Sequence, residues 1–156
     1  VGLWVVADGM GGHSAGDYAS AMIIERLGAL PRPGSVYDFI ESIEDALVQV
    51  NTDLIRTAVT RGVDIIGSTV VVLVHDRDFM LCGWVGDSRV YCFEEGRLRQ
   101  ITSDHVHGMK EDVTQFGSAS VQPQVMATSS GESACPQRNA RRAISWRSGR
   151  CPLGEV

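Results

Sequence analysis

A strand that is apolar on both faces is the strongest constraint on how this chain can fold. Residues 79–85 alternate two apolar sets, with Phe79, Leu81 and Val85 on one face and Met80, Cys82 and Trp84 on the other. Successive side chains of a strand point to opposite faces, so such a strand requires cover on both sides. We therefore expect a layered α+β fold, with helices over one face and a second sheet over the other.

Three further strands are predicted around this one. Residues 68–75 include the β-branched run Thr-Val-Val-Val-Leu-Val, which is typical of a strand. Gly86-Asp87-Ser88 is interpreted as a tight hairpin turn into a strand over residues 89–93, and a second turn leads into residues 97–101. In this antiparallel meander Cys82 and Cys92 face each other across the turn as a reduced pair.

The N-terminal third of the chain has a different periodicity. Residues 3–7 form a short apolar run that predicts a buried strand ending at Asp8-Gly9. Apolar residues then recur at three- and four-residue spacing over 19–30, which predicts an amphipathic helix that Pro31 stops. Ser35 is a suitable N-cap for a second, longer helix that ends near Gly62.

Composition excludes several classes of protein. The net charge is −5 and the first two thirds of the chain carry no basic stripe, so we do not expect nucleic-acid binding. No apolar run approaches the roughly 20 residues of a membrane helix, so no membrane span is expected. None of the four cysteines forms a C-x-x-C pair, which favours reduced thiols in a cytoplasmic protein over a disulfide scaffold or a zinc site.

Residues 107–156 lack the patterns of the preceding segment. The stretch from 118 onward contains many serines and arginines and has no sustained apolar period. One interpretation is a disordered tail, and another is a segment read from a shifted frame. We therefore predict a domain over 1–106 and an atypical segment over 107–156 that does not complete it.

Three short segments contain residues suited to chemistry. Asp8 and Gly9 follow a buried strand, where a carboxylate and a backbone carbonyl offer the hard oxygen ligands that Mg²⁺ and Mn²⁺ prefer. The alternative is a plain strand-to-helix turn in which the aspartate caps the helix. Asp87 and the pair Asp104-His105 are the other two candidates. For Asp87 the alternative is an ordinary turn residue, and for Asp104-His105 it is a surface loop.

Together, in this order, these segments resemble the bacterial branch of the metal-dependent PPM/PP2C-type protein serine/threonine phosphatases. The matching stretches are LWVVADGMGGHSAG (3–16), GSTVVVLV (67–74), WVGDSRVY (84–91) and GRLRQITSDH (96–105). The resemblance implies a four-layer α-β-β-α sandwich with two central antiparallel sheets. It also implies hydrolysis of phosphoserine and phosphothreonine on proteins by a water activated at a two-metal centre, with a cognate Ser/Thr kinase as a further partner.

The resemblance assigns roles to four residues. Asp8 resembles the carboxylate that bridges two core Mn²⁺ or Mg²⁺ ions, and Gly9 the residue whose carbonyl binds the second ion. Asp87 resembles the aspartate linked to a third, more weakly held ion. His13 matches a loop histidine that donates a proton to the leaving oxygen, with an ordinary surface histidine as the alternative.

The chain also departs from the family pattern. No stretch of the given residues matches the family's N-terminal segment, with its phosphate-binding arginine and acidic ligand, and residues 107–156 contain no match to two later aspartates. The alternative function is therefore a catalytically inactive, phosphatase-like protein that binds phosphoproteins or regulates signalling.

Overall fold

The computed structural model describes residues 1–77, 79–94, 96–105, 126–128 and 145–150. Two long helices, α1 (His13–Gly28) and α2 (Val36–Arg61), follow the first strand, β1 (Gly2–Met10). Strands β2 (Ile65–Asp76) and β3 (Phe79–Val85) come next, and then the short strands β4 (Tyr91–Glu94) and β5 (Arg97–Gln100). Strands β6 (Met126–Thr128) and β7 (Ser145–Arg150) complete the described elements.

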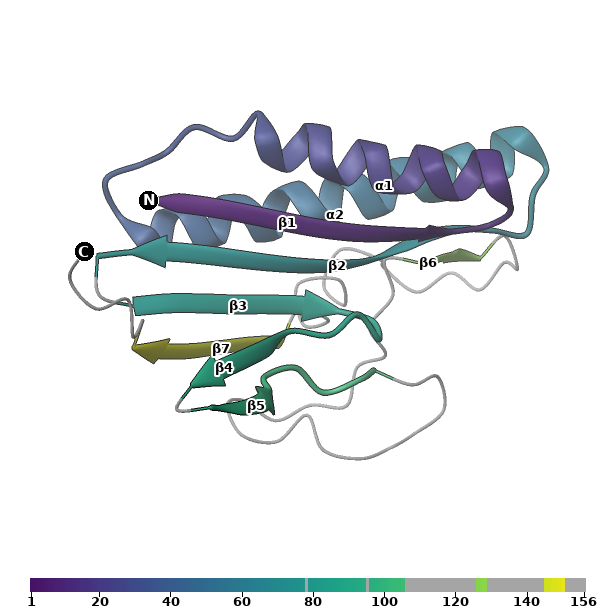
Figure 1. Ribbon diagram of the computed structural model, residues 1–156. Helices are drawn as coiled ribbons and strands as arrows, with labels where there is room; N and C mark the ends of the chain where they lie inside the picture. The colour runs from purple at the N-terminus through teal and green to yellow at the C-terminus, as the bar shows by residue number, and fades with distance from the viewer. Residues whose placement is uncertain (78, 95, 106–125, 129–144, 151–156) are drawn as a thin grey trace.

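The strands form one large and one small antiparallel sheet (Figure 1). The large sheet has the order β1-β2-β3-β7, with β6 paired to the start of β2, and the small sheet is the β4–β5 hairpin. Helix α1 packs on the large sheet through β1 and β2, and α2 packs on it through β2 and β6. The result is the mixed α+β architecture with antiparallel sheets that the sequence predicts.

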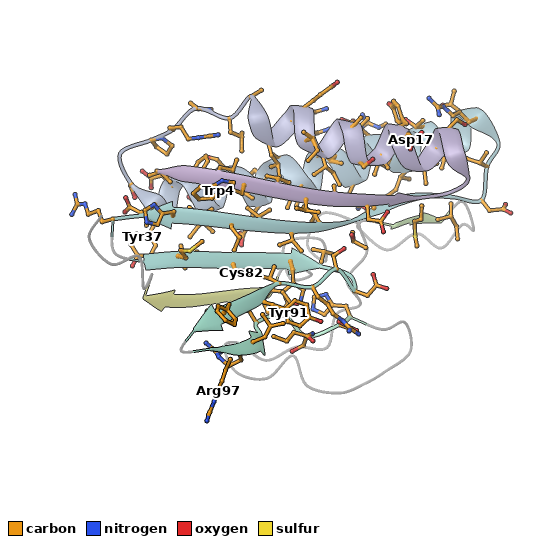
Figure 2. The ribbon with its side chains drawn as sticks, viewed as in Figure 1. Trp4, Asp17, Tyr37, Cys82, Tyr91 and Arg97 are labelled. Atoms are coloured by element: carbon orange, nitrogen blue, oxygen red, sulfur yellow. The ribbon has the colours of Figure 1, made fainter. Side chains whose placement is uncertain are left out.

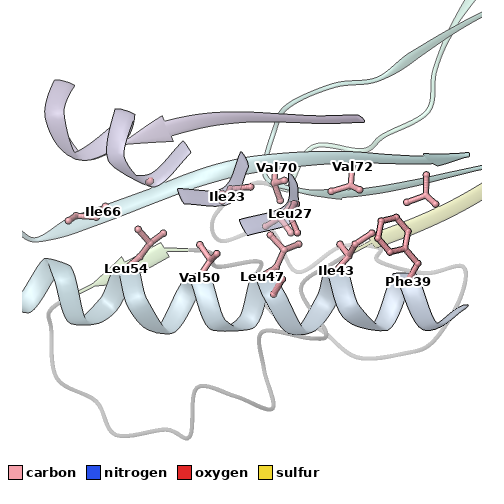
Figure 3. Close-up of a cluster of buried hydrophobic side chains, with 14 of the residues drawn as sticks. Ile23, Leu27, Phe39, Ile43, Leu47, Val50, Leu54, Ile66, Val70 and Val72 are labelled. Atoms are coloured by element: carbon pink, nitrogen blue, oxygen red, sulfur yellow. The ribbon is translucent and has the colours of Figure 1, made fainter. Parts of the chain in front are cut away.

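Helix α2 shows how local signals and packing agree. The Ser35 hydroxyl accepts a hydrogen bond from the Asp38 backbone N–H at 3.4 Å, as an N-cap should. Gly62 ends the helix in the left-handed conformation, at φ 63°, where glycine carries no Cβ penalty. Between these caps one face of the helix is buried against the sheet, and it holds Phe39, Ile43, Leu47, Val50 and Leu54 (Figure 3).

The two faces of the doubly apolar strand β3 are covered as predicted for four of its residues. Leu81 and Val85 pack with the helix-side core. Cys82 and Trp84 belong to a second, smaller cluster on the opposite face, together with Val71, Leu73, Val90 and Ile101. In the described ranges, neither helix has both the length and the apolar composition that crossing a membrane requires.

The predicted hairpin across Gly86-Asp87-Ser88 is wrong. Strand β3 pairs with β2 and β7, whereas β4 begins at Tyr91 and pairs only with β5 in the described residues. Cys82 therefore lies opposite Leu73 in the large sheet, and Cys92 lies opposite Arg99 in the hairpin. The two cysteines are reduced thiols, but they are not cross-strand neighbours. Figure 2 shows Cys82 in the large sheet and Tyr91 in the separate hairpin.

Two described strands lie in the C-terminal segment, where the sequence shows no strand pattern. Strand β6 pairs with residues 65–67 of β2, and β7 pairs with residues 79–84 of β3. The rest of 107–156 lies outside the described residues, so its disorder or frame-shifted origin stays a prediction, as does the domain boundary at residue 106.

Candidate metal centre

The end of strand β1 holds the first two candidate ligands. The strand runs through Met10, so Asp8 and Gly9 lie within it, opposite Thr69 and Ser68 of β2. Helix α1 begins after Gly12 and has no side-chain cap. The alternative role of Asp8 as a helix-capping turn residue is therefore excluded.

Alternation along β1 places Asp8 and Gly9 on opposite faces of the sheet. Asp8 is exposed on the face away from the helices. Gly9 lies under α1 so closely that a Cβ there would sit 1.8 Å from the Gly16 carbonyl oxygen. No side chain fits in that space. The close packing of α1 on β1 thus holds the Gly9 backbone in place.

The loop that carries Asp87 is joined to β2 beside Asp8. Thr69 Oγ1 and Ser88 Oγ are 2.6 Å apart, within hydrogen-bond distance. Gly86 adopts φ +100°, and a Cβ there would lie 2.8 Å from Thr69 Cγ2. Thr69 is the cross-strand partner of Asp8, and directly opposed residues have Cβ atoms about 4.5–5.5 Å apart. The structure therefore brings the strand of Asp8 and the loop of Asp87 to the same end of the same sheet face.

Residues 102–105 bind the other side of this loop. The Gly86 N–H donates to His105 Nδ1 at 3.1 Å, and the His105 N–H donates to the Gly86 carbonyl at 2.9 Å. The imidazole stacks on the Trp84 ring with centroids 5.9 Å apart. Arg89 donates hydrogen bonds from both Nε and Nη2 to the Asp104 carboxylate. Asp104-His105 is thus more than a surface loop, because it anchors the preceding motif.

Electrostatics follow from these contacts. Hydrogen bonds to Asp104 raise the pKa of Arg89, and the same contacts lower the pKa of the Asp104 carboxyl. Burial lowers the pKa of His105, and the negative charge of Asp104 partly opposes that shift. Because Nδ1 accepts from the Gly86 N–H, the imidazole is neutral and carries its proton on Nε2.

The donors present fit Mg²⁺ or Mn²⁺ in kind but are too few. Asp8, Asp87 and the Gly9 carbonyl supply the hard oxygens that these ions prefer. Within the described ranges, however, no three His, Cys, Asp or Glu side chains gather as a group that could hold a metal ion. His13, the fourth candidate, is the first residue of α1. These residues form part of a possible ligand set and do not complete it.

The sequence did not predict two features of this site. One is the role of Thr69, whose hydroxyl joins β2 to the Asp87 loop. The other is the pair of hydrogen bonds between His105 and Gly86. A signal for it was available in the opposite charges of Arg89 and Asp104, because charge-assisted bidentate pairing is favourable. Pairing of these two residues brings His105, the next residue, to the loop that contains Gly86.

Comparisons with known proteins agree with this geometry. The family model described as protein phosphatase 2C matches residues 1–147. The chain is 35% identical over 106 residues to the serine/threonine phosphatase stp of Listeria welshimeri, covering 65% of this chain and 42% of the relative. It is 34% identical over 104 residues to the serine/threonine protein phosphatase PstP of Mycobacterium tuberculosis, covering 65% and 20% of the two chains.

Solved structures show the same partial match. PppA of Pseudomonas aeruginosa superimposes with a TM-score of 0.66 and 42% identity, over 68% of this chain and 47% of PppA. The catalytic domain of PstP in complex with two manganese ions superimposes with a TM-score of 0.58 and 28% identity, over 67% and 46% of the two chains. This chain therefore spans less than half the length of these relatives.

Proposed function

The chain belongs to the protein phosphatase 2C family, and on that basis we propose that it takes part in metal-dependent hydrolysis of phosphoserine and phosphothreonine on proteins. The observation that carries the proposal is the Thr69–Ser88 hydrogen bond. It joins the Asp87 loop to the strand partner of Asp8. The strand of Asp8 and the loop of Asp87, which are far apart in the sequence, thereby meet at one end of a sheet face.

Each candidate residue has a specific task in this proposal. Asp8 and the Gly9 carbonyl would hold two Mn²⁺ or Mg²⁺ ions together with ligands that the described residues lack, and Asp87 would contribute to a third ion. When bound, such ions supply an activated water and offset charge on phosphoryl oxygens. His13, at the start of α1, would protonate the leaving oxygen of the serine or threonine.

The proposal extends to architecture and partners. The helices cover one face of the large sheet, while Trp4 and Val6 on the other face are 55% and 63% exposed. These exposed residues support assignment of the chain to part of a four-layer α-β-β-α sandwich. Phosphorylated proteins, and a Ser/Thr kinase that produces them, are the proposed partners, and the cytoplasmic location stays a prediction.

A second candidate is a catalytically inactive protein that binds phosphoproteins or regulates signalling. The incomplete ligand set in the described ranges favours it. A magnesium ion requires about six oxygen ligands in octahedral geometry, which Asp8 and Asp87 cannot provide for two ions. For the 156-residue polypeptide we therefore expect weak or no turnover of p-nitrophenyl phosphate with Mn²⁺. Robust Mn²⁺-dependent hydrolysis would reject the inactive alternative.

The assignment of Asp8 is tested in a completed domain. Residues 1–105 of this chain replace the matching segment of the PstP catalytic domain, and Asp8→Asn is compared with Asp17→Asn. Asp17 is an exposed carboxylate on α1, on the side of the helix away from the sheet (Figure 2). Asp8→Asn should lower Mn²⁺-dependent kcat about 100-fold or more, because it removes a ligand of metal-ion catalysis, whereas Asp17→Asn should not. Equal activities would refute the role of Asp8.

A further inference from the structure

The backbone of Gly86 is held from two directions by one residue. Its N–H donates to the side chain of His105, and its carbonyl accepts from the backbone N–H of the same residue. Two opposed hydrogen bonds leave the peptide groups on either side of Gly86 little freedom to rotate. Asp87 is the next residue, so the direction of its Cα–Cβ bond follows from the orientation of Gly86.

The imidazole that makes one of these bonds is itself held in place. It stacks nearly parallel to the Trp84 ring, with an interplanar angle of 10°. Trp84 is 4% exposed, and its Nε1–H donates to the Ser103 carbonyl at 2.8 Å. The indole therefore supports the ring of His105 on one side and the backbone preceding it on the other.

Position 86 does not accommodate a residue with a side chain. At φ +100° a Cβ on residue 86 would be strained whatever the space, and it would also meet the side chain of Thr69. The loop thus sits between Thr69 on β2 and His105 on the following segment. Its position relative to Asp8 depends on both contacts.

We propose that His105 is a positioning residue that aims the Asp87 carboxylate toward the end of β1, by accepting the Gly86 N–H at Nδ1. The inference rests on the proposed function, because it takes Asp87 as a metal ligand. In this role His105 acts through the backbone of Gly86 and not as a ligand itself. Its contribution is to fix the loop before an ion binds, so that binding does not carry the cost of ordering Asp87.

Two substitutions of His105 distinguish the role of its hydrogen-bond acceptor from the role of its aromatic ring. In His105→Asn the amide Oδ1 occupies the place of Nδ1 relative to Cβ, so the acceptor remains and the aromatic stack is lost. In His105→Phe the stack on Trp84 remains and the acceptor is lost. A positioning role through Nδ1 requires that the asparagine variant resemble the wild type. A role in packing alone requires that the phenylalanine variant do so.

The first measurement needs neither metal nor turnover. Amide hydrogen exchange of Gly86 is followed by NMR in the full 156-residue chain. His105→Phe should accelerate exchange at Gly86 about fivefold or more, as expected for the loss of one hydrogen bond, while Leu73 in β2 keeps its protection. His105→Asn should stay within about twofold of the wild type. Acceleration in the asparagine variant alone would overturn the proposal.

The second measurement follows Mn²⁺ at Asp87. Titrated Mn²⁺ broadens the amide signals of residues near the ion, and the half-broadening concentration at Ser88 reports local affinity. It should rise about fivefold or more in His105→Phe and little in His105→Asn. An unchanged value in His105→Phe would overturn the positioning role. Broadening that persists in Asp87→Asn would instead refute Asp87 as a ligand, so this control distinguishes a failure of the proposed function.

Discussion

The two faces of the large sheet differ in how they are covered. Alternate residues of β1 show the contrast within one strand, because Leu3 and Val5 pack into the helix-side core while Trp4 and Val6 are 55% and 63% exposed. On the helix side the buried residues form one continuous cluster with α1 and α2. On the other side the buried cluster that the described residues form is smaller, with Val71, Cys82 and Trp84.

This contrast separates stability from the candidate site. Burial of apolar surface is the main favourable term in folding, and it is concentrated on the helix side. Asp8, Thr69 and the Asp87 loop all lie on the sparsely covered side. We infer that substitutions on the helix side mainly change the free energy of unfolding, whereas substitutions on the other side mainly change the site.

The largest effect is expected deep in the helix-side core. Leu54 is fully buried on α2, so Leu54→Ala should lower the free energy of unfolding by about 3 kcal/mol, through lost burial and the cavity left behind. Val59 lies on the same helix and is 64% exposed. Val59→Ala is the matched control and should change stability by less than about 0.5 kcal/mol. Urea unfolding compares the two, and equal losses would remove the contrast between core and surface.

A second prediction tests the close approach of α1 to β1. Gly9→Ala places a methyl group against the Gly16 carbonyl and should cost about 2–3 kcal/mol, since the backbone must shift to relieve the overlap. Gly28→Ala is the control, because no heavy atom lies within 4 Å of a Cβ there. It should be neutral or stabilising by about 0.5 kcal/mol. Thermal unfolding would contradict the packing if Gly9→Ala were tolerated equally well.

A third prediction concerns pH and the sparsely covered side. Burial lowers the pKa of His105 in the folded chain, despite the opposing charge of Asp104. His105 therefore binds a proton more readily in the unfolded chain than in the folded one. The stability that neutral His105 contributes to the folded chain is present above about pH 6.5 and is lost as the pH falls below it. Urea unfolding at pH 7.5 and 5.5 should show a smaller pH dependence in His105→Asn than in the wild type. An identical dependence would contradict the shift.

The smallest change in stability is expected at an exposed residue of β1. Val6→Thr retains a β-branched shape at an exposed position and should change stability by less than about 0.5 kcal/mol. Val72→Thr makes the same change at a residue that is 1% exposed on the helix side, and it should cost about 1–3 kcal/mol because a hydroxyl is buried. Similar unfolding free energies for the two variants would show that both faces are equally covered.

The exposed apolar residues of β1 also predict poor solubility. Exposed apolar patches favour association, and Trp4, Val6 and Met10 lie on one face of an edge strand in the described sheet. Light scattering should show less association for Val6→Thr than for the wild type. An unchanged level would exclude this face as the cause.

Much of the fold could be predicted from periodicity and caps. Ser35 and Gly62 identified the ends of α2, and the β-branched run identified β2, because these signals act within a few residues of the chain. The two apolar sets of β3 correctly predicted cover on both of its faces. The motif order also indicated the family, to which the chain belongs.

Tertiary structure decided which strands pair and which residues hold the site together. Gly86-Asp87-Ser88 has the composition of a hairpin turn, but composition does not specify the partner of the next strand. The two bonds to His105 and the contact with Thr69 direct the chain away from β3, and β4 then pairs with β5. Local sequence signals reach only a few residues, whereas these contacts join residues about twenty positions apart and form only once the chain has folded.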